Sequence, residues 1–102
     1  MAVTTDTRWS GLPNIPTVGE FVKGYEASAW FGVGAPRNTR IEIIDFLNGQ
    51  INAVLDEPKT IARLTELGGT VLIGSPSDFG KLIADETEKW ARVIRTANIK
   101  PE

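Results

Sequence analysis

The chain has 102 residues, a length that supplies one small hydrophobic core and leaves little room for a second domain. Apolar residues make up 41% and charged residues 24%, which is ordinary globular usage and argues against a disordered or fibrous chain. The 11 basic and 13 acidic residues are interspersed, so there is no basic stripe and we expect no nucleic-acid partner. Cysteine and histidine are absent, which removes thiolate and imidazole ligands and the common nucleophile–base pairs. We therefore expect no enzyme, no catalytic residue, no metal site and no cofactor.

Helix breakers dominate the first part of the chain. They are Gly11, Pro13, Pro16, Gly19 and Gly24. Such dense spacing favours turns and predicts a connector over residues 6–26. One helical turn is predicted inside it, because Thr17 can cap a helix and Glu20, three residues later, completes a capping box.

Two apolar segments are predicted to be strands. Residues 27–34 combine aromatic, β-branched and small residues and are followed by Ala35 and Pro36. Residues 70–74 form a short apolar run of the kind found in strands that are covered on both faces.

Three helices are predicted from apolar periodicity and from end signals. The first spans Thr39 to Leu55, and the second begins at Pro58 and ends at Gly68 and Gly69. The third, a long helix, follows Ser75, with Pro76 at its first position and Asp78 returning a capping bond. Opposite charges at i, i+4 spacing on its outer face predict three ion pairs: Lys81–Asp85, Asp85–Lys89 and Glu88–Arg92.

The predicted order is strand, helix, helix, strand, helix, which indicates the α/β class, with two to three strands and three helices. A sheet this narrow has open edges and cannot cover three amphipathic helices. The sequence therefore predicts that part of the domain is missing.

Several segments together resemble the Bug family, the periplasmic substrate-binding receptors of tripartite tricarboxylate transporters. Residues 12–20, LPNIPTVGE, match the family's Leu-Pro-x-(Val/Ile)-Pro-Thr-(Val/Ile)-x-Glu segment. Tyr25–Glu26 match its Gly-(Phe/Tyr)-Glu segment, and residues 30–36, WFGVGAP, match its Trp-x-Gly-x-x-Ala-Pro strand. The resemblance covers nearly the whole chain, through residues 99–102, but only the C-terminal third of such a receptor.

This resemblance implies part of a type II periplasmic-binding-protein lobe. Residues 1–26 would be a connector with a short edge strand at residues 2–4 and a turn, and residues 27–102 the C-terminal part of the first lobe. Family members bind a small carboxylate between two lobes and deliver it to membrane transporter subunits, so a periplasmic location is implied. The chain carries no export signal of its own and would be cytoplasmic if expressed as written.

The ligand-holding loops of the family lie mainly in the absent two thirds, so we expect little ligand binding from this chain alone. The alternative function is a structural or interaction module that self-associates, as a homo-oligomer or a swapped dimer, to complete its sheet. A cytosolic enzyme or regulator ranks last, because the residues for catalysis are lacking.

The candidate ligand-binding residues are Ser28, Trp30 and Phe31 on the predicted crossing strand. Two aromatic walls with a hydroxyl suit a small-molecule pocket, but adjacent strand residues face opposite sides, so at most one aromatic faces a cleft. We favour burial in the core for both aromatics, and solvation or a local hydrogen bond for Ser28. Weaker candidates are the helix start at Ser75, the turn with Arg37 and Arg40, Arg92 with Arg95, and Glu86 with Trp90. For the first we favour capping, for the two arginine pairs a place on the surface, and for the last the edge of an apolar stripe.

Overall fold

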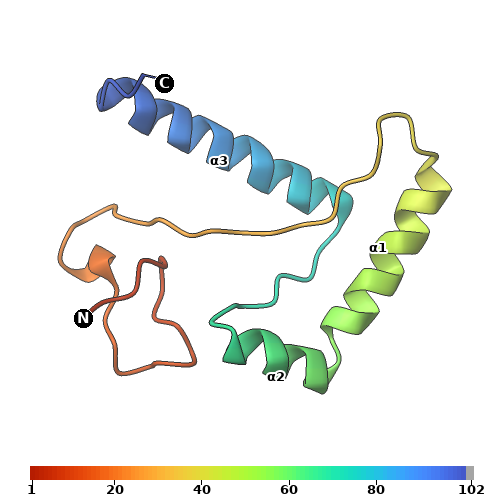
Figure 1. Cartoon of the computed structure of the whole chain (residues 1–102), viewed down its shortest axis with the longest axis horizontal. Helices are drawn as coiled ribbons and strands as arrows, with labels where there is room; N and C mark the ends of the chain where they lie inside the picture. Colours follow the sequence, from red (N-terminus) through yellow and green to blue (C-terminus); the bar gives the residue numbers. More distant parts are fainter. Residues whose placement is uncertain (101–102) are drawn as a thin grey trace.

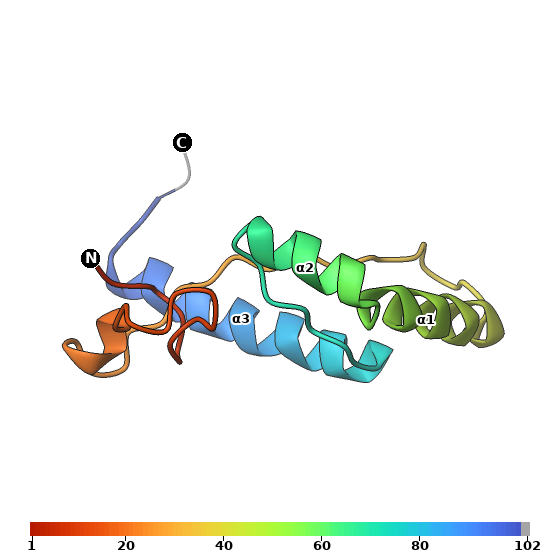
Figure 2. The same cartoon turned by 90° about the horizontal axis from the view of Figure 1, so that it is seen from below.

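The computed structural model describes residues 1–100, and Figure 1 shows three helices joined by long irregular segments. The helices are α1 (Ile41–Leu55), α2 (Pro58–Glu66) and α3 (Pro76–Thr96), preceded by a single 3₁₀ turn, η1 (Val18–Glu20). Helix α1 contacts both α2 and α3. In the second view, α1 and α2 lie end to end on one side of α3 (Figure 2).

The predicted starts of α2 and α3 are confirmed, whereas α1 begins at Ile41, two residues after the predicted Thr39. The Ser75 side chain accepts a hydrogen bond from the Asp78 N–H, and the Asp78 carboxylate accepts one from the Ser75 N–H, with Pro76 in the first turn of α3. Pro58 likewise opens α2. Each of these starts depends on residues within one turn, which is why sequence spacing alone identifies them.

The helix ends are equally local. Gly68 has a φ of 83°, and the N–H groups of Gly68 and Gly69 donate to the carbonyls of Thr65 and Leu64. This is the Schellman pattern, which needs a left-handed residue just after the helix. Asn98, with a φ of 52°, ends α3 in the same way.

Side-chain amides join α1 to the segment before α3. Asn48 and Asn52, one turn apart on α1, each donate to the Gly74 carbonyl oxygen at 2.9 Å. Their shared acceptor fixes where the chain enters α3 relative to α1.

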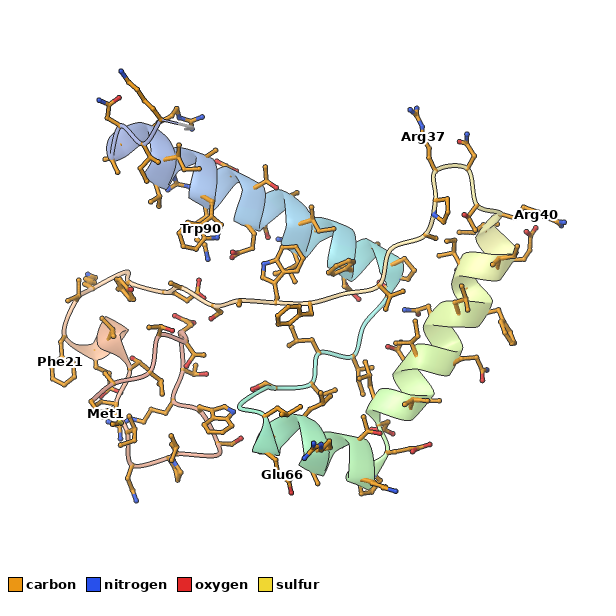
Figure 3. All side chains as sticks on the ribbon, viewed as in Figure 1. Met1, Phe21, Arg37, Arg40, Glu66 and Trp90 are labelled. Atoms are coloured by element: carbon orange, nitrogen blue, oxygen red, sulfur yellow. The ribbon has the colours of Figure 1, made fainter. Side chains whose placement is uncertain are left out.

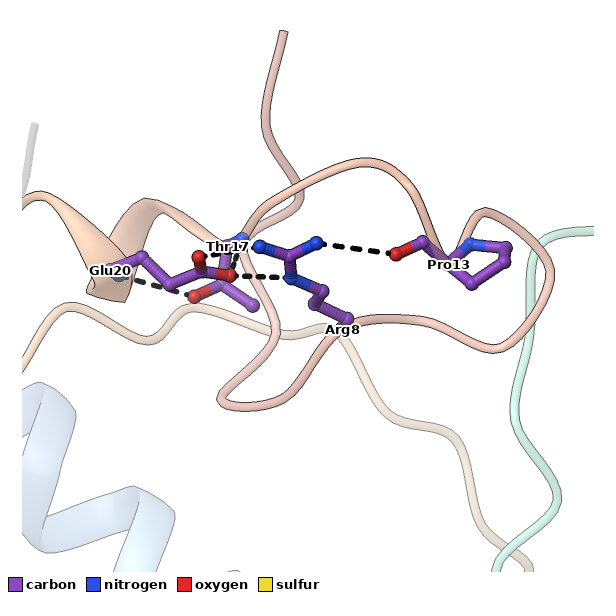
Figure 4. Close-up of polar contacts among 4 residues, drawn as sticks. All are labelled: Arg8, Pro13, Thr17 and Glu20. Atoms are coloured by element: carbon purple, nitrogen blue, oxygen red, sulfur yellow. Dashed lines mark hydrogen bonds and ion pairs between the residues drawn. The ribbon is translucent and has the colours of Figure 1, made fainter.

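The N-terminal loops are organised around Thr17, which is 3% exposed. Val3 and Thr17 form an isolated parallel bridge, and the predicted capping box of Thr17 and Glu20 is confirmed. Arg8 donates to both carboxylate oxygens of Glu20, at 2.8 and 2.7 Å, and reaches the Pro13 carbonyl (Figure 4). One bidentate ion pair therefore ties the start of the chain to η1.

Glu20 should titrate far below an ordinary glutamate. The Arg8 hydrogen bonds, followed by the Thr17 N–H, lower the pKa of Glu20 from 4.5 to about 2. Because the folded pKa is lowered, the contribution of the pair is complete above pH 4.5 and is lost only as the pH falls through about 2. An NMR titration of the Glu20 side-chain carboxyl carbon should show this midpoint, and Arg8→Ala should move it up towards 4.5. An unchanged midpoint in Arg8→Ala would contradict the ion pair.

The predicted α/β class is wrong for this chain. The three helices are present, but among residues 1–100 the only β pairing is the Val3–Thr17 bridge, and residues 27–34 and 70–74 form no strand. A strand is defined by hydrogen bonds to a neighbouring strand, and neither segment has such a neighbour in this chain. The apolar composition of these segments favours strands, but composition cannot supply the neighbouring strand.

No hydrophobic core is present in the described residues. None of the apolar side chains is buried there, and large ones stand open on every helix and loop. Those more than half exposed include Phe21, Phe31, Phe46, Leu67, Leu72 and Ile99. The radius of gyration is 16.6 Å, against about 13 Å for a compact domain of 100 residues. The described residues are therefore less compact than a self-contained domain of this length.

Among residues 1–100, no helix combines the length and the apolar character needed to cross a bilayer.

Candidate functional site

The candidate site lies on the extended segment that runs beside α3 (Figure 1). The two run antiparallel, because Glu26 meets Lys89 towards the end of α3, whereas Trp30 meets Phe79 in its first turn. We call residues 26–35 the strap.

Trp30 and Phe31 point to opposite sides of the strap. The Trp30 ring meets the Phe79 ring edge to face, with 5.6 Å between centroids and 84° between planes. Gly32, two residues on, lies against the same ring, since a Cβ built there would come closer than 3.0 Å to three atoms of Phe79. Phe31 is 96% exposed and Val33 71%. One face of the strap therefore rests on α3, and the other is apolar and open.

Lys89 anchors the start of the strap to α3. Its ammonium lies 2.6 Å from Glu26 and 2.5 Å from Glu86, whose other oxygen accepts the Trp90 indole N–H at 2.9 Å. The hydrogen bonds from Lys89 lower the pKa of both carboxyls, and those to Glu26 and Glu86 raise the pKa of Lys89. Glu86 is thus a paired carboxylate with a lowered pKa, and not an acid whose pKa is raised by burial.

Ser28 is exposed on the strap, close to this network. After Lys89, the nearby Ser28 hydroxyl also contributes to lowering the pKa of Glu26. The three predicted residues, Ser28, Trp30 and Phe31, thus all lie on the strap. Neither hollow on the described residues includes any of them.

The weaker candidates are engaged elsewhere or open to solvent. The Ser75 hydroxyl is taken up by Asp78 and Ser77 at the start of α3. Figure 3 shows Arg37 and Arg40 at the turn before α1, pointing outwards, and Arg40 lies 3.4 Å from Glu42. Arg92 lies 3.9 Å from Glu88, as the spacing predicts. None of them converges with the strap.

The sequence analysis missed two contacts: the ion pair of Lys89 with Glu26 on the strap, and the hydrogen bonds from Asn48 and Asn52 to the Gly74 carbonyl before α3. Lys89 was expected to pair with Asp85, but it bonds Glu86 and Glu26, and Asp85 pairs with Lys81. No signal in the sequence joins Lys89 to a glutamate 63 positions away. The amides of Asn48 and Asn52, placed at i, i+4 on one face of α1, did carry a signal, because paired amides on a helix call for a shared partner.

No enclosed cavity accompanies these residues in the described part of the chain. Shallow, open hollows occur on α3 around Arg92, Val93 and Ala97 and on α1 around Ile51 and Val54, away from the strap. The described residues also hold no group of acidic side chains arranged like a metal site. What the strap offers is therefore an open apolar face, and neither hollow includes a residue of the strap.

Comparison with known proteins agrees with this partial character. The family model described as tripartite tricarboxylate transporter family receptor matches residues 1–99. BugT of Bordetella pertussis is 35% identical in an alignment of 103 positions that covers 98% of this chain and 31% of that protein. A UPF0065 protein of Bordetella bronchiseptica is 33% identical over 99% of this chain and 30% of its own length.

A solved structure shares the backbone. The structure titled R. palustris Rpa4515 with adipate superposes with a TM-score of 0.87 at 41% identity, covering 100% of this chain and 34% of that one. The chain thus spans about a third of the length of the proteins it matches. The expectation that it is not an enzyme is confirmed by the family, which is one of receptors. By its match over residues 1–99, the chain belongs to the tripartite tricarboxylate transporter receptor family.

Proposed function

We propose that this chain is the C-terminal third of a receptor for a small dicarboxylate and supplies one wall of the binding site. The observation that carries this is the agreement of the whole chain with about a third of an adipate-bound structure. The open, shallow form of the hollows on the described residues supports the expectation that residues 1–102 alone bind little ligand. By the family's description, the complete receptor would work in the periplasm and deliver its ligand to membrane transporter subunits.

Within the strap, Phe31 is the strongest candidate for contact with the ligand. Trp30 packs edge to face against Phe79, and the Ser28 hydroxyl lies near enough to Glu26 to lower its pKa, whereas Phe31 is open. An aromatic wall can cover the methylene chain of a dicarboxylate, and the carboxylates then need donors from elsewhere in the receptor.

The test uses a grafted receptor, defined as the R. palustris protein in which the matching third is replaced by residues 1–102. It should bind adipate by isothermal titration, and the isolated chain should not. Phe31→Ala should weaken binding by about tenfold or more, since the lost apolar cover is worth ~1.4 kcal/mol. Ser28→Ala should have a smaller effect.

Phe21→Ala is the matched control, because Phe21 is also an exposed phenylalanine but lies outside the strap. Its affinity should stay close to that of the unmodified grafted receptor. Equal affinities for Phe31→Ala and Phe21→Ala would remove Phe31 from the site, and tight adipate binding by the isolated chain would contradict the proposed division of the receptor.

A second candidate function is self-association. The observation that favours it is the apolar surface exposed on all three helices, which a second copy could cover. Light scattering separates this possibility from the first, because the molar mass of the isolated chain should rise with concentration only if copies associate.

A further inference from the structure

One asparagine of α1 is followed directly by a glycine. Asn48 and Gly49 lie in the middle of the helix, where Asn48 is half-buried and Gly49 is exposed. The backbone nitrogen of the residue after an asparagine can attack the side-chain amide, and glycine hinders this attack least, because it has no Cβ and the widest choice of backbone angles. The other asparagines of the chain are each followed by a residue with a Cβ: Asn14, Asn38, Asn52 and Asn98.

This attack begins deamidation, a reaction whose only co-reactant is water. The Gly49 backbone nitrogen gives up its proton and bonds to Cγ of Asn48. The Cγ–Nδ2 bond breaks, and Nδ2 leaves with its electron pair and that proton as ammonia. Water then opens the cyclic imide by adding its hydroxyl to one imide carbonyl carbon while the ring nitrogen takes back a proton. Addition at Cγ gives aspartate, and addition at the main-chain carbonyl carbon gives isoaspartate.

The folded chain opposes this reaction in two ways. Within an α-helix each N–H donates to the carbonyl four residues earlier, so the Gly49 nitrogen is engaged in a hydrogen bond. The Asn48 side chain is also held, because Nδ2 donates to the Gly74 carbonyl at 2.9 Å and Oδ1 accepts from Asn52 at 3.3 Å. Attack therefore requires α1 to open at Gly49.

Several features of α1 make such an opening easy. The helix has 15 residues, a length at which helices are marginal without tertiary support, and none of these residues is buried. Arg40 at its N-cap makes no side-chain capping hydrogen bond. Gly49 weakens the helix further, because glycine has a low helix propensity. Local opening is expected in a region with so few buried contacts.

We propose that Asn48 is a site of spontaneous deamidation, that opening of α1 at Gly49 controls its rate, and that the product loosens the start of α3 from α1. In the product, an anionic oxygen replaces the donor Nδ2 and faces the Gly74 carbonyl oxygen with no proton between them. Isoaspartate also adds a methylene to the main chain, which disrupts the hydrogen bonding of α1. None of these steps involves the proposed ligand.

Peptide mass spectrometry of the chain of 102 residues, incubated at mildly alkaline pH with and without urea, measures the rate at each asparagine. Asn48 should convert about tenfold or more faster than Asn52, which shares its helix and its acceptor but precedes an alanine. Urea should raise the Asn48 rate by about tenfold or more, because unfolding replaces local opening.

Gly49→Ala is the variant that tests the attacking nitrogen. A Cβ built at Gly49 meets nothing within 4 Å among the described residues, so this variant introduces no clash. It should lower the Asn48 rate by about tenfold or more, with and without urea. Equal rates in Gly49→Ala and the unmodified chain would overturn the proposal, as would equal rates at Asn48 and Asn52. An Asn48 rate that urea leaves unchanged would overturn the control by α1, and so would a folded chain that never converts.

Asn48→Asp supplies the product for a separate test of its effect on α1. Gln50→Glu is the matched control, because it makes the same change from amide to carboxylate at an exposed position of the same helix. Amide hydrogen exchange at residues 51–55 should be about fivefold faster in Asn48→Asp than in Gln50→Glu, as expected for the loss of one hydrogen bond. Equal exchange in the two variants would show that α1 does not depend on the Asn48 amide and would overturn the proposed loosening.

Discussion

In the grafted receptor, Gly32→Ala is expected to lower the free energy of unfolding by about 1–3 kcal/mol, the usual cost of overpacking. The reason is steric, because a Cβ at this position would stand closer than 3.0 Å to three atoms of the Phe79 ring. Phe79 cannot simply turn away without giving up its edge-to-face contact with Trp30. Urea unfolding measures the difference as a lower midpoint at an unchanged slope.

Gly34→Ala is the matched control on the same strap. Nothing in the described residues lies within 4 Å of a Cβ built at Gly34, so its midpoint should barely move. The double variant Gly32→Ala/Phe79→Ala separates the clash from a general effect on the backbone, because it removes the ring that the new methyl would meet. Its loss should be smaller than the sum of the two single losses, with a coupling of about 0.5–3 kcal/mol. Additive losses would show that Gly32 is not required by Phe79.

The success of the sequence-based predictions follows the range of the interactions involved. The starts of α2 and α3 and the capping box of Thr17 depend on residues at most three positions apart, and all were predicted. The left-handed glycine after α2 belongs to the same class. For these features, the residue types and their spacing contain the whole physical cause.

The errors concern partners that lie far away or outside the chain. Residues 27–34 and 70–74 have strand-like composition, but whether they are strands depends on neighbours that these 102 residues do not contain. Lys89 had a plausible partner one turn away in Asp85, and the fold gave it Glu26 instead. Such choices are decided by tertiary packing, which a single sequence does not encode in its spacing.

For the candidate site too, local features could be predicted from the sequence, and contacts with distant residues could not. The family motifs identified the strap and, through it, Ser28, Trp30 and Phe31. Alternation along an extended backbone then correctly placed the two aromatics on opposite sides, with Trp30 on Phe79 and Phe31 open. Their contact with a ligand stays a prediction, because neither hollow on the described residues includes them. The division into a connector of 1–26 and a lobe segment of 27–102 also stays a prediction, and Pro101 and Glu102 lie outside the described residues.

The second large effect is expected for Lys89. Lys89→Met keeps the length of the side chain but removes the cation between Glu26 and Glu86, which lie close enough that the charge of Glu26 raises the pKa of Glu86. Two carboxylates then face each other, and the strap loses its anchor at that end. We expect a clearly lower urea midpoint for the grafted receptor at pH 7, with faster amide exchange at residues 28–31.

The matched control, Lys81→Met, lies on the same helix. Lys81 forms an i, i+4 pair with Asp85, but its side chain is 75% exposed, whereas that of Lys89 is 29% exposed. Exposed pairs of this kind contribute little, so the Lys81→Met midpoint should stay within about 0.5 kcal/mol of the unmodified protein. Equal losses for the two variants would mean that Lys89 acts only as another surface charge.

The pH dependence gives the sharper test of the Lys89 network. Glu26 and Glu86 have lowered pKa values when folded, so their share of the stability is complete above their ordinary value of 4.5 and is lost as the pH falls through the lower folded values. Lys89 has a raised pKa, so its share is complete below 10.5 and is lost only at higher pH. The stability gap between the unmodified protein and Lys89→Met should therefore be constant near neutral pH. The gap should narrow in acid, where Glu26 and Glu86 become protonated. Protonation removes their attraction to Lys89 in the unmodified protein and their mutual repulsion in Lys89→Met. A gap that persists unchanged in acid would mean that Lys89→Met destabilises the protein for a reason other than the lost attraction between Lys89 and the two carboxylates.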